Sequence, residues 1–141
     1  MFVQNSNESR QFFIGVRNKL VGGEILQPLE SMVATILSAH PEYDDLLADQ
    51  AKALSDEYIS QHYDMNPFLH LSLHLALQEQ LDTNRPTGIK AIFQNLKLRG
   101  FGDEHFVRHK MMECLAESLY KAQMSQSAPD QADYLRCLKS I

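Results

Sequence analysis

The sequence predicts an all-α fold, a compact helical bundle of about five to seven helices in a single domain over residues 1–141. Apolar side chains recur every three or four residues along most of the chain, which is the spacing of one face of an α-helix. No stretch of useful length alternates apolar and polar residues as a half-buried strand would. A chain of 141 residues with 44% apolar content is large enough to bury a core.

The first half of the chain is predicted to hold two helices and a short helical stretch. A helix over residues 7–20 ends at the glycine pair 22–23. A second helix begins at Pro28, because proline suits the first helical position, and runs to about His40. The stretch PEYDDLLADQAKAL then predicts one or two short helices, and residues 55–65 are predicted to form a loop.

The second half is predicted to hold four helices with clear start signals. Asn66 is a strong N-cap residue and Pro67 stands at the first helical position after it. Asp103 is the predicted N-cap of the longest helix. The four predicted helices cover residues 66–83, 86–100, 104–124 and 130–138.

Composition argues against several classes of protein. A net charge of −5 with scattered basic residues disfavours a nucleic-acid partner. No window of 18 apolar residues predicts a membrane span, and the first residues lack a signal-peptide pattern, so a cytoplasmic protein is expected. Cys114 and Cys137 lack CxxC spacing, and in a reducing compartment they are predicted to be buried free thiols rather than a disulfide or metal ligands.

Two histidines one turn apart stand in the segment NPFLHLSLHLALQEQL. On a helical wheel His70 and His74 share a narrow sector with Leu77 and Leu81. The rest of this helix is apolar nearly all round, which is typical of a central helix. Both imidazoles are therefore expected to face the interior.

The longest predicted helix presents a second such pair. His105 and His109 share a face with Met112, and Glu113 lies about 40° from His109 on the wheel. Imidazoles four residues apart are close enough to bind one ion, and neighbouring helices pack closely enough for their side chains to meet. The two pairs with Glu113 predict a metal site for zinc, iron or manganese, with zinc or iron favoured.

Three further side chains are weaker candidates. Glu30 stands at the third position of its helix, where it either caps free amides or binds the metal. His40 precedes Pro41 at a helix end, where it either caps carbonyls or joins the ligands. Glu117 is a candidate for orienting a ligand imidazole from behind, or is simply solvated. With Glu30 and His40 the inventory becomes five histidines and two carboxylates, the ligand count of hemerythrin-like di-iron bundles, although the order and spacing do not align.

Two functions remain open. The first is a metal-binding helical bundle, either a metal-dependent hydrolase acting on a small molecule or a di-metal oxygen or redox protein. The second is a non-enzymatic interaction or scaffold protein whose buried histidines form a hydrogen-bonded network. Neither a Gly-rich phosphate loop nor HExxH nor GxSxG is present, so no catalytic residue is assigned.

Several stretches together resemble a known family. LQPLE with HPEY downstream, then NPFLHLSLHLALQEQL, RPTGI and GDEH…H…MECLAESLYKAQ resemble the proteobacterial domain of unknown function 1841 in order and in spacing. The resemblance covers nearly the whole chain and implies a small cytoplasmic bacterial protein, with no activity attached. The family's usual tryptophan near position 120 is Tyr120 here, a departure that does not touch the candidate ligands.

Overall fold

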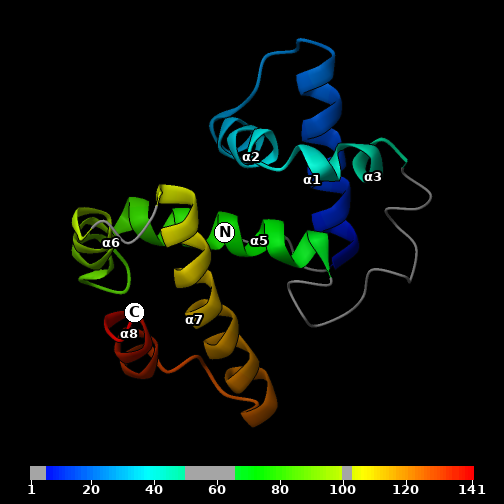
Figure 1. Ribbon diagram of the computed structural model, residues 1–141. Coiled ribbons are helices and arrows are strands. Elements are labelled where there is room, and N and C mark those ends of the chain that lie inside the picture. Colours follow the sequence, from blue (N-terminus) through cyan, green and yellow to red (C-terminus); the bar gives the residue numbers. More distant parts are fainter. Residues whose placement is uncertain (1–5, 50–65, 100–102) are drawn as a thin grey trace. The chain divides into compact units, whose positions relative to one another are not determined.

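The computed structural model describes residues 6–49, 66–99 and 103–141 (Figure 1). Within these ranges the fold is entirely helical, as predicted, and no strand is present. Seven α-helices and the 3-10 helix η1 follow one another: α1 (Ser6–Val21), α2 (Pro28–Ser38), η1 (Pro41–Tyr43), α3 (Asp44–Ala48), α5 (Pro67–Thr83), α6 (Ile89–Leu98), α7 (Glu104–Ser125) and α8 (Gln131–Lys139). The predicted loop over residues 55–65 lies outside the described residues. None of the described helices has the combination of length and apolar character that crossing a membrane requires.

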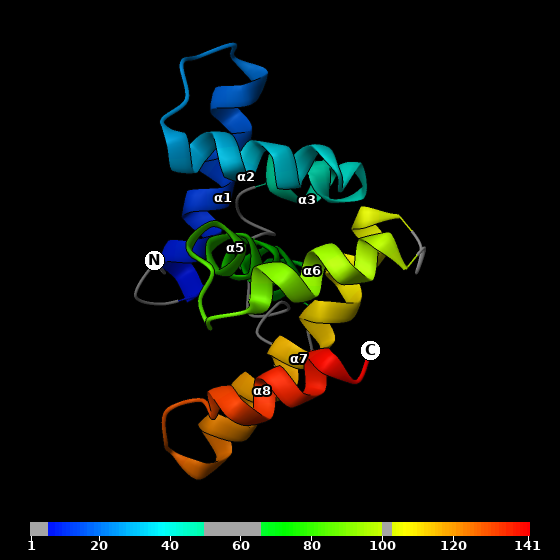
Figure 2. The same cartoon turned by 90° about the vertical axis from the view of Figure 1, so that its left-hand side faces the viewer.

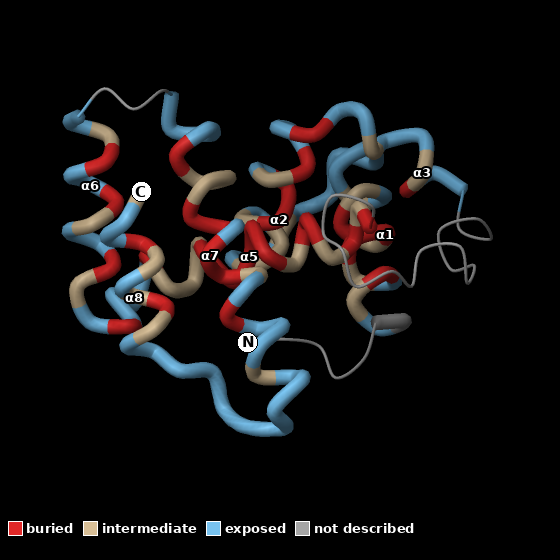
Figure 3. Tube along the Cα trace, turned by 60° about the horizontal axis from the view of Figure 1, so that its bottom comes forward, coloured by how far each residue is buried: buried red, intermediate tan, exposed pale blue. Residues whose placement is uncertain are grey.

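The chain divides into two compact units, Met1–Leu75 and Ala76–Ile141, with the boundary inside α5. We call these the N-terminal unit and the C-terminal unit. The single domain expected from the sequence stays a prediction, and each unit is described by itself. α5 consists of buried and half-buried residues and is exposed only at its C-terminal end (Figure 3). Such burial is what its nearly continuous apolar surface predicts.

In the N-terminal unit, α1 packs against both α2 and α3, and α2 runs across α1 (Figure 2). The core forms where the apolar faces of these helices meet the first turns of α5; its fully buried members include Phe13, Val16, Val33 and Leu71. A bidentate ion pair between Arg17 and Asp44 ties α1 to α3, with nitrogen–oxygen distances of 3.0 and 3.3 Å.

α2 begins where the sequence predicts and ends two residues earlier. Pro28 occupies its first turn, and a capping box links Gln27 and Glu30 across the helix start. The helix ends at Ser38, because the residue before a proline is disfavoured in helical geometry, and His40 precedes Pro41. His40 accordingly leaves the helical region, with φ −129° and ψ 61°.

In the C-terminal unit, α7 packs against α6 and α8, and α6 also packs against α8. Figure 2 shows α8 running beside the second half of α7. The largest fully buried side chains of this unit are Leu77, Ile89, Leu96, Met111, Met112 and Leu138. Tyr134 of α8 is also buried, and its hydroxyl donates to Gln80 of α5 at 2.7 Å. α8 is therefore fixed by packing and by a hydrogen bond.

The predicted start of the helix at Pro86 is wrong. Helix α6 begins at Ile89, and Pro86 stands in a turn after a cis peptide bond. The Asn84 side chain accepts hydrogen bonds from the backbone amides of Gly88 and Lys90. An asparagine upstream of the helix thus satisfies backbone amides at the start of α6. Gly88 has φ +100°, a conformation that glycine adopts readily.

The predicted pair of free thiols is also wrong. Cys114 of α7 and Cys137 of α8 form a disulfide, and their Cα atoms lie 5.7 Å apart. That separation is ordinary for a disulfide. The two residues are 23 positions apart, and only the packing of α8 against α7 brings them together. Sequence spacing alone carries no sign of this contact.

Replacing Asp103 with alanine is expected to destabilise the protein by about 1 kcal/mol. Asp103 caps α7, as predicted, and its side chain accepts from the Phe106 amide at 2.8 Å. Alanine leaves that amide without this acceptor. Urea unfolding followed by circular dichroism measures the loss. Asp103→Asn is the matched control and should retain most of the stability, because asparagine caps as well as aspartate; equal losses in both variants would contradict a capping role.

Candidate metal centre

Three buried histidines lie together in the N-terminal unit. His70 and His74 stand one turn apart on α5, and His40 lies between α2 and η1. Their exposed fractions are 8%, 4% and 3%. The helical spacing places the α5 pair on one face, and the proline after His40 turns the chain at the end of α2. Two separate segments thus bring imidazoles into one interior region.

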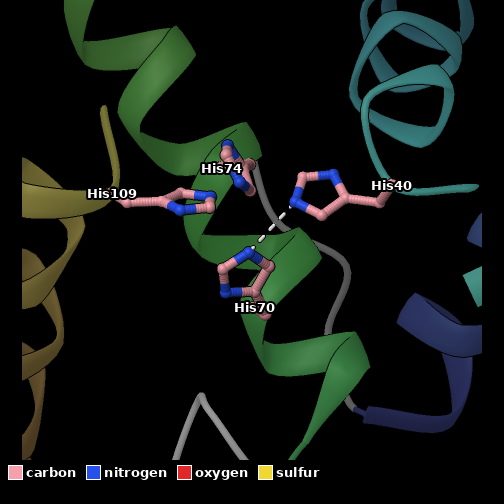
Figure 4. Close-up of side chains that lie close together, drawn as sticks. All are labelled: His40, His70, His74 and His109. Atoms are coloured by element: carbon pink, nitrogen blue, oxygen red, sulfur yellow. Dashed lines mark hydrogen bonds between the residues drawn. The ribbon is translucent and has the colours of Figure 1, made fainter. Parts of the chain in front are cut away.

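The three rings form a nearly regular triangle. Ring centroids are 5.0 Å apart for His40 and His70, 4.6 Å for His40 and His74, and 4.8 Å for His70 and His74. Each pair is edge-to-face, with interplanar angles between 68° and 78°. In one of these pairs, that of His40 and His70, a ring nitrogen of each residue points at the other (Figure 4).

The tautomer of His40 follows from its hydrogen bond to the backbone. Its Nδ1 lies 2.8 Å from the carbonyl oxygen of Ile36. A carbonyl only accepts, so Nδ1 carries the proton and the Nε2 of the neutral ring is left with a lone pair. A hydrogen bond from one ring nitrogen to a backbone carbonyl is the usual way in which metal-binding histidines are oriented. His40 therefore presents Nε2 as a donor atom for a cation.

That Nε2 lies 3.1 Å from the Nε2 of His70, the contact dashed in Figure 4. Two ligand nitrogens on one tetrahedral ion, each about 2.1 Å from it, stand about 3.4 Å apart. The observed separation is close to that value. It also fits a hydrogen bond in which His70 donates to His40. The same geometry is thus compatible with a shared ion and with a shared proton.

Tyr43 lies against the ring of His40. The two rings are stacked, with centroids 5.4 Å apart and planes 2° from parallel. Tyr43 is half-buried, and the loss of hydration raises the pKa of its hydroxyl, with Glu42 adding to the effect. The sequence analysis does not name Tyr43 as a site residue. Its position three residues after His40, within HPEY, is the feature of the sequence that could have indicated it.

These three histidines form the group of close nitrogen donors. One ring nitrogen from each of His40, His70 and His74 lies within 4.8 Å of the other two, and all three residues are buried (Figure 4). Among the predicted ligands, the structure therefore brings together both histidines of α5 and His40 within the N-terminal unit. His109 of α7 belongs to the C-terminal unit, and its role as a ligand stays a prediction.

His105 stands apart from this group. It is exposed, and its ring contacts that of His109 one turn along α7, with centroids 4.0 Å apart. The sequence placed the two on one face, and they do share it. His105 occurs at the exposed end of that face because it lies in the first turn of the helix.

The carboxylates of α7 make surface ion pairs. Glu113 pairs with Lys110 at 3.6 Å and Glu117 pairs with Lys121 at 3.2 Å, and both carboxylates are about half exposed. Neither belongs to the group of close donors. Glu113 lies about 40° from His109 on the helical wheel, and at that angle its side chain faces solvent.

Glu30 has the partners of a capping residue. Its carboxylate accepts from the backbone amide of Gln27 at 2.8 Å and from the ammonium group of Lys19 at 2.8 Å. These two hydrogen bonds, that of Lys19 above all, hold the pKa of Glu30 below its usual value. Of the two roles expected from the sequence, the structure provides the contacts for the cap.

Glu30→Gln is accordingly expected to leave metal affinity unchanged within about twofold, because this carboxylate serves the start of α2. A lowered pKa stabilises the fold above the unfolded value of about 4.3, and that contribution disappears as the pH falls. The stability difference between wild type and variant should therefore shrink on acidification from neutral pH. Zinc titration and urea unfolding at several pH values measure both effects. A large loss of zinc affinity in this variant would instead make Glu30 a ligand.

Comparison with known proteins adds a family and no activity. The family described as a domain of unknown function, DUF1841, matches residues 5–140. No curated protein and no solved structure shows significant similarity to the chain. The chemistry of the histidine group must therefore carry any functional assignment.

Proposed function

The chain thus belongs to the DUF1841 family, and we propose that its N-terminal unit binds a divalent transition-metal ion, zinc or iron, through His40, His70 and His74. The observation that carries this proposal is the mutual proximity of three buried imidazoles, whose ring nitrogens lie within 4.8 Å of one another. Buried polar groups need partners, and one ion satisfies a nitrogen of every ring at once.

The distances require only a small contraction. Nitrogens bound to one tetrahedral ion stand about 3.4 Å apart, whereas the widest pair here is within 4.8 Å. Rotations about the χ angles of two side chains cover such a difference. The hydrogen bond to the Ile36 carbonyl already orients the His40 ring. Binding an ion through Nε2 therefore costs little further conformational entropy.

The donor set favours zinc and iron among the candidate metals. Imidazole suits zinc, copper, iron and nickel, whereas manganese prefers oxygen ligands. The group of close donors consists of histidines alone among the described residues. Neutral imidazole ligands leave the ion its full positive charge, which favours binding of an anion or a hydroxide.

The number of protein ligands decides between a structural and a reactive centre. Four protein ligands close a tetrahedral shell, which is typical of a structural zinc site. The three ligands His40, His70 and His74 leave a fourth position for water, whose pKa zinc lowers to about 7. We propose this open form, which metal-dependent hydrolysis of a small molecule, or redox chemistry with iron, requires.

A second candidate is a scaffold protein with a histidine hydrogen-bond network. The Nε2–Nε2 contact of 3.1 Å between His40 and His70 favours it, because the His40 tautomer makes that contact a good hydrogen bond without any ion. In this form the cluster gives specificity to the core and takes no part in chemistry. Metal content separates the two candidates.

Elemental analysis of tag-free protein tests the proposal directly. Protein from cells grown with zinc and iron is expected to contain about one equivalent of one of these metals per chain. Chelation should remove it, and the stripped protein should take up one equivalent of zinc or of cobalt(II), whose visible spectrum reports nitrogen ligation. Negligible metal before chelation and no uptake afterwards would overturn the proposal in favour of the hydrogen-bonded network.

A further inference from the structure

We propose that the Cys114–Cys137 disulfide is a reversible thiol-exchange site, reduced by a small thiol that enters a cleft of the C-terminal unit and attacks Cys137. Both cysteines line a surface cleft of about 410 Å³. Lys110, Glu113, Glu117 and Ser140 line the rest of it, with Ile141. This inference concerns the C-terminal unit alone and does not depend on the metal centre.

Access distinguishes exchangeable disulfides from inert ones. Thiol–disulfide exchange begins when a thiolate reaches one of the two sulfurs. A disulfide closed inside a core offers no such approach, whereas an exposed one is the labile kind. Here the bond borders a cleft large enough for a small thiol.

The two sulfurs are not equivalent. Cys114 belongs to the buried residues of α7, with an exposed fraction of 6%. Cys137 is only half-buried, on the short helix α8. A thiolate in the cleft therefore meets Cys137 first, and Cys114 is the leaving sulfur.

The exchange balances with two equivalents of a monothiol. The first thiolate attacks the sulfur of Cys137, the S–S bond breaks, and Cys114 leaves as a thiolate that takes up a proton. A second thiolate attacks the external sulfur of the mixed disulfide and releases Cys137 as a thiolate, which is protonated in turn. The protein gains two electrons and two protons, and two thiols become one external disulfide.

The protein has contacts that hold α8 after reduction. Tyr134 donates to Gln80 and Leu138 is fully buried. An ion pair of 3.2 Å joins Asp133 of α8 to Lys121 of α7. Because these contacts do not involve the cysteines, we expect the dithiol form to remain folded and to reoxidise, as a reversible site requires.

The cleft also contains a group that slows an anionic attacker. A carboxylate oxygen of Glu117 lies 3.9 Å from the sulfur of Cys137. The charge of this carboxylate repels an approaching thiolate, and the repulsion is screened as salt is added. Glu117→Gln removes the charge and keeps the shape.

Trapping the intermediate tests the proposal. Folded protein is incubated with glutathione without denaturant, quenched with N-ethylmaleimide, and mapped by mass spectrometry of peptides. We expect glutathione on Cys137 and the maleimide on Cys114, with unchanged far-ultraviolet circular dichroism. Reduction only after denaturant is added, or glutathione on Cys114 alone, would overturn the proposal.

The Glu117→Gln variant provides a second measurement. Its exchange with glutathione at low salt is expected to be about threefold faster than that of wild type, and the difference should shrink at high salt. Glu113→Gln is the matched control, because Glu113 lines the same cleft and has no contact with the sulfur comparable to that of Glu117. Equal rates for wild type and Glu117→Gln would contradict attack at Cys137.

Discussion

His74→Ala is expected to lower the affinity of the protein for zinc by more than about 100-fold, since loss of even an outer partner of a metal ligand costs about 10–100-fold. His74 is buried and lies beside both His40 and His70, at centroid distances of 4.6 and 4.8 Å. Its removal leaves the ion two imidazole nitrogens, those of His40 and His70. Competition of the stripped protein with a chromophoric zinc chelator measures the affinity.

His105→Ala is the matched control for this experiment, because it removes an exposed histidine of α7 that lies outside the donor group. We expect its zinc affinity to stay within about threefold of wild type. Similar affinities for His74→Ala and wild type, with both proteins folded, would show that these imidazoles do not hold the ion. A folded His74→Ala protein is verified by circular dichroism.

Reduction of the Cys114–Cys137 disulfide is expected to lower the free energy of unfolding by about 3 kcal/mol, the value for a cross-link that closes a loop of this length. The two residues are 23 positions apart, and the closed loop restricts the unfolded chain. The melting temperature should fall by about 10 °C. Thermal unfolding of the oxidised protein and of the protein in dithiothreitol measures this shift in melting temperature.

The variant Cys114→Ser/Cys137→Ser separates the cross-link from side effects of the reductant. Its melting temperature should match that of the reduced wild type and should not respond to dithiothreitol. A reduced wild type that melts at the same temperature as the oxidised protein would show that the cross-link does not restrict the unfolded state. Loss of the far-ultraviolet signal on reduction at 25 °C would show that the fold requires the disulfide, and would contradict a reversible exchange site.

Most of the fold follows from local signals in the sequence. Pro28, Pro67 and Asp103 mark helix starts that the structure reproduces to within a residue. The start of α6 was missed, because Asn84 caps it from four residues upstream of Gly88 and a proline in the turn mimics a first helical position. Local patterns fail where a distant side chain provides the cap.

The site is less predictable from sequence than the helices that carry it. Periodicity places His70 and His74 on one interior face, because both lie on one apolar helix. It also predicts that His105 and His109 share one face of α7, which they do. Their role as ligands stays a prediction, since a helical wheel says which face a residue occupies and not what that face meets. The disulfide, like the contact of His40 with His70, depends on tertiary packing that no spacing rule contains.

The boundary between the two units lies after Leu75, one residue beyond His74 and in the middle of α5. In an α-helix each amide bonds the carbonyl four residues earlier, so the amides of residues 76–79 bond the carbonyls of residues 72–75. Cutting the gene at this boundary would break those bonds and leave two frayed helix ends. Fragments meant to isolate one half of the protein should therefore each carry all of Pro67–Thr83, and the histidine-bearing turn would then be present in both.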